Sequence, residues 1–164
     1  MRNVIALMMV AGLGACGQEA AKPVAAEVPK TLPAGEYEIA GEVTKLASAD
    51  KTIPATRLKM GGKDSVRACV AADGTPDPRM FVEPGDKCTV NNNYGRSGRM
   101  SVQYTCQRAG KGEVFVNADG NYKADSFEAV VVAASAFSGT GDYNLTRRLT
   151  ARRIGACPGT AAQG

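Results

Sequence analysis

Two cysteines, Cys88 and Cys106, constrain the fold more than any other feature of the chain. The segment that they bound, CTVNNNYGRSGRMSVQYTC, is typical of a β-hairpin with the three-residue loop Arg96-Ser97-Gly98, whose glycine takes the left-handed position. Gly95 and Arg99 would close this loop. In that register, residues whose numbers sum to 194 face each other, so the two cysteines lie directly opposite.

The same register predicts one core-facing and one polar face for the hairpin. The expected core face consists of Cys88, Val90, Asn92, Tyr94, Met100, Val102, Tyr104 and Cys106. The residues between them are polar throughout, as in an antiparallel pair that is buried on one side. The cysteines also fall on a non-hydrogen-bonded pair, where side chains approach most closely. We therefore predict a Cys88–Cys106 disulfide.

The first residues predict export and lipid attachment. One positive residue is followed by an uncharged apolar run that ends at residue 15, which is the plan of a secretory signal. This run is shorter than the about 20 residues that span a bilayer. Leu13-Gly14-Ala15-Cys16 resembles the bacterial lipobox, in which the cysteine is acylated and becomes the first residue after cleavage. Gly17, in place of aspartate, resembles the outer-membrane sorting signal.

The remaining organisation follows from composition. Residues 16–34 are rich in Ala and Pro, bury too little surface to fold, and are interpreted as a tether. Residues 35–158 suit one domain, and residues 159–164 are expected to be a disordered tail. The formal charge of +4 is too small and too dispersed to indicate a nucleic-acid partner.

The other cysteines complete the disulfide plan. With Cys16 acylated, four of the five cysteines remain, and an even set in an exported protein favours two disulfides. Cys69 then pairs with Cys157. A zinc site is disfavoured because the chain has no Cys-x-x-Cys pair and no histidine, so no metal or other cofactor is expected.

Alternation of apolar and polar residues predicts strands over most of the domain. Expected strands cover 35–46, 55–60 and 65–71, with a turn at Gly61-Gly62, and a helical turn capped by Thr75 is expected in the following loop. Residues 112–135 should form two strands, with Asp119-Gly120 favoured over Ala124-Asp125 as their turn. Residues 129–134 are apolar at every position and predict a covered, central strand, and residues 141–157 predict a long final strand.

These observations predict an all-β domain: a single antiparallel meander that forms a curved sheet or small open barrel, stapled by two disulfides. The chain also resembles a bacterial family known as domain of unknown function 3617. The resemblance rests on AGEYE at the domain start, Cys69 before an acidic, proline-containing loop, the cystine hairpin, and RRIGAC at the end. It implies an exported, β-rich protein with paired cysteines and no established activity.

The residues give no sign of catalysis. Nucleophilic catalysis needs an activated nucleophile beside a base, but histidine is absent and all four domain cysteines are expected to be oxidised. The spacing of the carboxylates marks no acid–base pair, so they are interpreted as a solvated face. These carboxylates are Glu36, Glu38, Glu42, Asp119, Asp125, Glu128 and Asp142.

An arginine cluster is the remaining candidate site. Strand alternation places Arg148 and Arg152 on one face, and Arg147 and Arg153 on the other. Arg148 and Arg152 would form a patch for an anionic partner, although edge strands also carry charge simply to prevent aggregation.

The expected function is a non-catalytic binding or envelope-maintenance lipoprotein on the periplasmic face of the outer membrane. Its partners would be the membrane and an envelope protein or apolar ligand. The alternative is an inhibitor of a cell-wall hydrolase, acting through the loop from Asp73 to Pro84.

Overall fold

The computed structural model describes residues 28–158. The expectations for the signal segment, for Cys16 with the first part of the tether, and for the tail fall outside these residues. No helix between residues 28 and 158 is both long enough and apolar enough to cross a bilayer.

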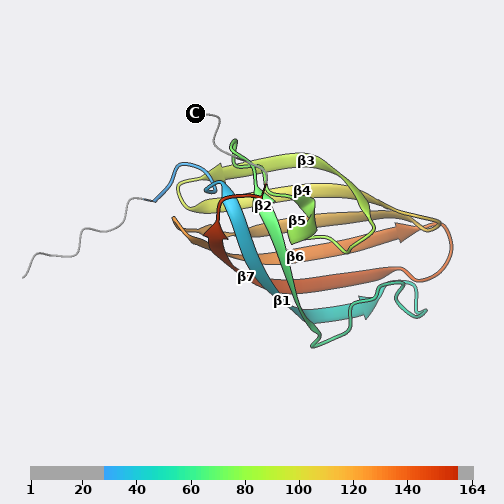
Figure 1. Cartoon of the computed structure of the whole chain (residues 1–164). Helices are drawn as coiled ribbons and strands as arrows, with labels where there is room; N and C mark the ends of the chain where they lie inside the picture. Colours follow the sequence, from blue (N-terminus) through green and yellow to red (C-terminus); the bar gives the residue numbers. More distant parts are fainter. Residues whose placement is uncertain (1–27, 159–164) are drawn as a thin grey trace, which may run out of the picture.

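Within the described residues, seven antiparallel strands form one sheet that curls into a half-barrel (Figure 1). The strands are β1 (Gly35–Ser48), β2 (Lys63–Val70), β3 (Lys87–Arg96), β4 (Arg99–Arg108), β5 (Gly112–Tyr122), β6 (Ser126–Phe137) and β7 (Tyr143–Gly155). One short 3-10 helix, η1 (Pro78–Met80), lies between β2 and β3. The all-β prediction is confirmed, and the two disulfides join the expected pairs, Cys88 with Cys106 and Cys69 with Cys157.

The strand order is β2-β1-β7-β6-β5-β4-β3. Strands β3 to β7 therefore form a meander, as expected, but β1 lies between β2 and β7. Leu46 of β1, for example, pairs with Leu145 of β7. The chain must cross from β2 at one edge of the sheet to β3 at the other, and residues 71–86 make this crossing.

The crossing segment fills the concave face of the sheet. Met80 and Phe81 are 0% and 2% exposed, and the Phe81 ring lies 6.1 Å from the rings of both Tyr104 and Phe127, which belong to the sheet. The Tyr104 hydroxyl donates a hydrogen bond to the carbonyl of Pro76. Burying such apolar surface stabilises a domain by about 25 cal/mol per Å², so this segment is an integral part of the core.

The cystine hairpin differs from its predicted form in two places, and the two resulting shifts in strand register cancel each other. The loop has two residues, Ser97 and Gly98, both with positive φ, as in a type I′ turn. Arg96 therefore pairs with Arg99, which shifts the register by one residue. A β-bulge between Val90 and Asn92 shifts it back, so Cys88 still faces Cys106.

One consequence of the bulge is that two side chains change face. Asn92 and Tyr94 pair with Gln103 and Ser101, so they lie on the outer face rather than on the predicted core face. On β4 the prediction is confirmed, since its inward residues Met100, Val102, Tyr104 and Cys106 are all buried.

Two local predictions before β3 are wrong in position. Residues 55–60 form no strand; they belong to the long loop between β1 and β2, and β2 pairs directly with β1. The helical turn begins two residues later than expected, with Asp77 as its cap and Pro78 as its first residue. The Asp77 carboxylate accepts a hydrogen bond from the Arg79 amide, which satisfies a free donor of this turn.

The predicted turn at Asp119-Gly120 is also wrong. Both residues lie inside β5, and the chain reverses at residues 123–125. Gly120 serves close packing of two strands instead: a Cβ there would collide with the carbonyl oxygen of Glu128 and lie 2.8 Å from the Cα of Ala129. A glycine within a strand often marks such a close backbone approach.

Residues 129–134 lie in β6, which is central as predicted, but only one of its faces is covered. Ala129, Val131 and Ala133 are buried in the core. Val130 and Val132, on the outer face, are 43% and 46% exposed. The expectation of a strand covered on both faces is therefore wrong for the isolated chain, because the sheet forms a single layer.

Candidate functional site

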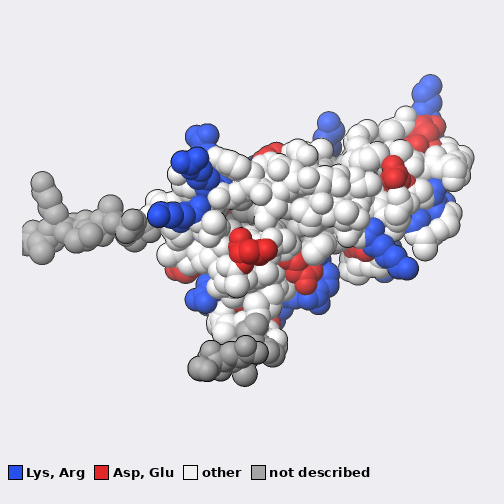
Figure 2. Space-filling model, turned by 90° about the horizontal axis from the view of Figure 1, so that it is seen from above, with Lys and Arg blue, Asp and Glu red and all other residues white. Residues whose placement is uncertain are grey.

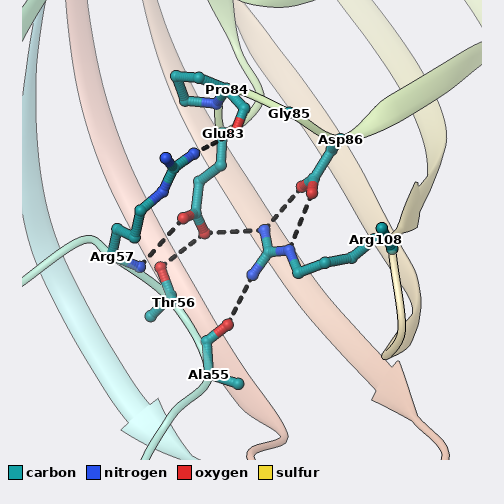
Figure 3. Close-up of a pocket in the computed structure, with 9 residues that line it drawn as sticks. Ala55, Thr56, Arg57, Glu83, Pro84, Gly85, Asp86 and Arg108 are labelled. Atoms are coloured by element: carbon teal, nitrogen blue, oxygen red, sulfur yellow. Dashed lines mark hydrogen bonds and ion pairs between the residues drawn. The ribbon is translucent and has the colours of Figure 1, made fainter.

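A cavity of about 450 Å³ opens at the end of the sheet where β4 ends and β3 begins (Figure 3). We call it the far-end cavity, because it lies opposite the end where the described chain starts. Three segments build it: residues 55–57 of the β1–β2 loop, residues 83–86 of the crossing segment, and Arg108 at the end of β4 with Ala109 after it.

Arg108 connects the three segments. Its Nε and Nη2 donate to the two carboxylate oxygens of Asp86 at 2.9 and 2.6 Å, a bidentate pair. Its Nη2 also donates to Glu83 at 2.9 Å, and its Nη1 donates to the carbonyl of Ala55 at 2.7 Å. The guanidinium lies 5.7 Å from the centre of the Tyr143 ring, within the range of a cation–π contact. Arg108 therefore uses its charge in ion pairs, its N–H groups in hydrogen bonds and its flat face in a contact with an aromatic ring.

Glu83 is equally well satisfied. One carboxylate oxygen accepts from the hydroxyls of Thr56 and Tyr143 and from Arg108, and the other accepts from the amide of Arg57. Burial alone would raise the pKa of this carboxyl. The hydrogen bond from Thr56 and the charge of Arg108, with the other donors, outweigh burial and hold the pKa below its ordinary value.

This arrangement suits a structural clamp better than acid–base chemistry. A general base works best with a pKa near the working pH, whereas Glu83 is stabilised as a fully bonded anion. Burial and the charge of Glu83 raise the pKa of Tyr143 above its ordinary value, so its hydroxyl keeps its proton. The clamp fixes two loops to the end of the sheet and leaves a polar, open cavity beside them.

The structure separates the four arginines of β7 as strand alternation predicts. Arg147 points inward, is 5% exposed, and forms an ion pair with Asp64 at 2.7 Å. Arg153 donates to the carbonyl of Ala34. Arg148 and Arg152 are exposed on the outer face. However, β7 is an interior strand rather than an edge.

Acidic neighbours on β1 lie beside the predicted anionic-partner patch. Arg152 forms an ion pair with Glu38 at 3.3 Å, and Glu38 also contacts Arg67. Arg148 stands opposite Glu42 in the register of β1 and β7. The pair therefore forms part of a mixed-charge surface, and whether it binds an anion stays a prediction.

The loop from Asp73 to Pro84 does not project from the domain as a free binding loop. Its centre is the buried part of the crossing segment, where Met80, Phe81 and Val82 contact the core. Nothing in this arrangement favours the hydrolase-inhibitor alternative.

A second candidate site lies on the outer face of the central strands. Phe115 of β5 and Val130 and Val132 of β6 are 47%, 43% and 46% exposed, and Phe115 pairs with the half-buried Ala134. We call these four residues the outer-face patch. Beside Phe115 and Val132 lies a shallow hollow of about 240 Å³, bordered by the amide side chains Asn91, Gln103 and Asn117.

Sequence reasoning missed both sites for identifiable reasons. The members of the clamp come from two loops and a strand end, where no periodicity marks them. Three members of the outer-face patch lie in the apolar run 129–134, but such a run by itself predicts a strand covered on both sides. The sequence pattern does not show that the sheet has a single layer, which leaves the outer face of β6 exposed.

Fold and surface together define a class of protein: a disulfide-stapled antiparallel half-barrel whose concave face is filled by its own chain. The chain belongs to the family described as "Protein of unknown function (DUF3617)", whose model matches residues 31–157. Comparisons with curated proteins and with solved structures found no match.

Proposed function

We propose that this protein is a non-catalytic binding module of the bacterial envelope, anchored through acylated Cys16 to the periplasmic face of the outer membrane. The lipobox-like segment and the signal-like start support the anchor. Two disulfides in one small domain support an oxidising compartment outside the cytoplasm.

The observation that carries the binding role is the outer-face patch. Exposed apolar residues are ordinary when scattered, but contiguous ones rimmed by polar residues mark interaction surfaces. Here Phe115 pairs with Ala134 on the adjacent strand, Val132 lies diagonally across from Phe115, and Val130 is next along the same face of β6. The rim contains amide side chains and, opposite Val130, the exposed Arg148.

Within residues 28–158, the concave face is filled by the crossing segment. The enclosed space between the sheet and the crossing segment is about 10 Å³, which is room for about one water molecule. The outer hollow is too shallow to enclose a small ligand, since ligand pockets typically measure about 300–1,000 Å³. A protein partner fits better, with one apolar side chain in the hollow and a carboxylate near Arg148.

Site-specific photo-crosslinking in the native envelope tests this function. We expect a photoreactive residue in place of Phe115 to give a discrete adduct with one protein. The same residue in place of Ala40, which is exposed on the outer face of β1, is the matched control. The substitution Val132→Lys should abolish the adduct at position 115. Identical adducts at both positions, or an adduct unaffected by Val132→Lys, would overturn the proposed binding face.

The anchor has a separate test. Mass spectrometry of the mature protein should show acyl chains on Cys16, and detergent partitioning should follow them. Cys16→Ala should remove both the added mass and the partitioning while leaving thermal unfolding of the domain unchanged. A wild-type protein without acyl mass would refute the anchor and leave the binding face to its own test.

A further inference from the structure

We infer that the end of the domain where the described chain begins docks onto the anionic headgroups of the membrane that carries the Cys16 anchor. This inference rests on the proposed anchor for its orientation. The docking surface is a group of four basic residues, Lys30, Arg96, Arg99 and Lys123, which we call the tether-end cluster. Figure 2 shows Lys and Arg side chains gathered at this end of the molecule.

Hydrogen bonds and strand pairing bring the cluster together around Tyr122. The Tyr122 hydroxyl donates to the carbonyl of Lys30 at 3.0 Å, and Lys123 follows it in the chain. The Tyr122 amide donates to Gly98, in the turn that Arg96 and Arg99 flank. Four basic residues from three separate segments thus lie on one end of the sheet.

The cluster is not neutralised within the domain. All four side chains belong to exposed residues, and none forms an ion pair within residues 28–158. Arg96 and Arg99 face each other directly across the hairpin. Like charges in this position destabilise a strand pair, so the arrangement weakens the folded domain unless an anion lies against it.

Two carboxylates at the same end are engaged by other groups. Asp73 accepts a hydrogen bond from the amide of Thr75, which lowers the pKa of its carboxyl. Asp125 accepts from the hydroxyl of Ser126. Neither forms an ion pair with the cluster within residues 28–158, and nor does Glu128, which stands opposite Asn121, the register partner of Arg99.

Chain length limits how far this end can lie from the bilayer. The described chain begins at Val28, whose side chain lies next to Gly98 beside the cluster, 3.0 Å from where a Cβ on that glycine would be. The twelve residue-to-residue steps from Cys16 to Val28 span at most about 40 Å when fully extended. An acylated Cys16 therefore keeps the cluster within reach of the headgroups. Each basic residue close to an anionic bilayer adds about 1 kcal/mol of attraction, and the attraction fades beyond a Debye length.

Vesicle binding by the unlipidated Cys16→Ala chain, produced with its disulfides, isolates the cluster from the anchor. We expect sedimentation with phosphatidylethanolamine vesicles that contain phosphatidylglycerol, but not with phosphatidylethanolamine alone, and a loss of binding as salt rises. In this background, Arg96→Gln/Arg99→Gln should weaken partitioning about 30-fold. The same double change should not lower the unfolding temperature, because it relieves the opposed charges.

The matched control is Lys51→Gln/Lys111→Gln, which removes the same charge from exposed lysines at the far end of the sheet. It should bind vesicles as the Cys16→Ala parent does. Equal losses in both double variants, or binding that ignores phosphatidylglycerol and salt, would overturn the docking surface. Acylated Cys16 without vesicle binding by the Cys16→Ala chain would overturn docking and leave the anchor intact. Salt-sensitive binding without acyl mass in the wild type would refute the anchor alone.

Discussion

Replacement of Arg108 by methionine tests whether the clamp beside the far-end cavity, formed by Arg108 with Glu83 and Asp86, stabilises the fold. The change leaves the side chains of Glu83 and Asp86, which are 7% and 5% exposed, without their cation. Removing one partner of a buried ion pair costs about 3–5 kcal/mol, because the remaining charge stays desolvated. For a domain of this size that loss lowers the unfolding temperature by roughly 10–20 °C. Denaturant unfolding at neutral pH, with the disulfides intact, measures it directly.

The pH dependence gives a second signature. In the wild type the pKa of Glu83 is lowered, so its contribution to the free energy of unfolding is present at neutral pH and lost as pH falls through the folded-state pKa. Without Arg108, burial dominates and the carboxyl protonates at higher pH, which stabilises the variant on acidification. The difference in the free energy of unfolding between the wild type and Arg108→Met should therefore become smaller as the pH falls from about 7 to about 3.

The matched control is Arg152→Met, which breaks the exposed ion pair with Glu38. The Arg152 side chain is 74% exposed, so this change should cost no more than about 0.5 kcal/mol. A loss below about 1 kcal/mol for Arg108→Met, or a gap that does not change with pH, would refute the reasoning.

Three further predictions concern the sheet and the disulfides. Gly120→Ala should destabilise the domain by about 1–3 kcal/mol or prevent folding, because the new Cβ collides with the carbonyl of Glu128; denaturant unfolding measures the loss. Replacing both Cys69 and Cys157 by alanine should cost about 4 kcal/mol, since their bond closes a loop of 88 residues, and non-reducing peptide mapping should recover this pair in the wild type. Burial raises the pKa of Tyr37 to about 12. The contribution of this tyrosine to stability is therefore present below the ordinary Tyr pKa and lost as the pH rises through the folded-state value. Tyr37→Phe should make the fall in the free energy of unfolding at alkaline pH less steep.

Each of these predictions has a control in the same sheet. Gly155→Ala adds a Cβ that meets nothing within 4 Å, and it should be neutral. Removal of the Cys88–Cys106 bond, which closes only 18 residues, should cost about 3 kcal/mol, less than the longer loop. Tyr94 is 50% exposed, so Tyr94→Phe should leave the alkaline decline unchanged. Crossed cysteine pairs, a harmless Gly120→Ala, or equal effects of both tyrosine changes would contradict the corresponding prediction.

The fold class and the disulfides could be predicted from the sequence because they depend on local patterns of residues. Alternation along β7 separated Arg147 from Arg148 and Arg152 correctly, because the strand has one face on the core and one on the outside. The cysteine pairing was also right, although its assumed loop was not, since the bulge near Asn91 compensates for the shorter turn. The fold class and the disulfides were thus predictable from local patterns.

Non-local features escaped prediction. Asp119-Gly120 is a strong turn signal locally, but packing of β5 against β6 decides what Gly120 does. The ends of the clamp, Ala55 and Arg108, lie 53 residues apart, and no local spacing connects them. The candidate sites depend on which segments meet in space, which a single sequence does not encode in any short pattern.

The position of β1 has a consequence for how the chain assembles. Synthesis runs from the N-terminus, so β1 is the first strand made and its neighbour β7 is the last. The sheet therefore has two parts, the β1–β2 pair and the β3–β7 meander. The pairing of β1 with β7, which we call the seam, joins the two parts. The meander contains only neighbours in sequence and can form early, whereas the seam closes at high contact order. Cys88–Cys106 lies within one piece; Cys69–Cys157 bridges the seam and can form only after the two pieces have met.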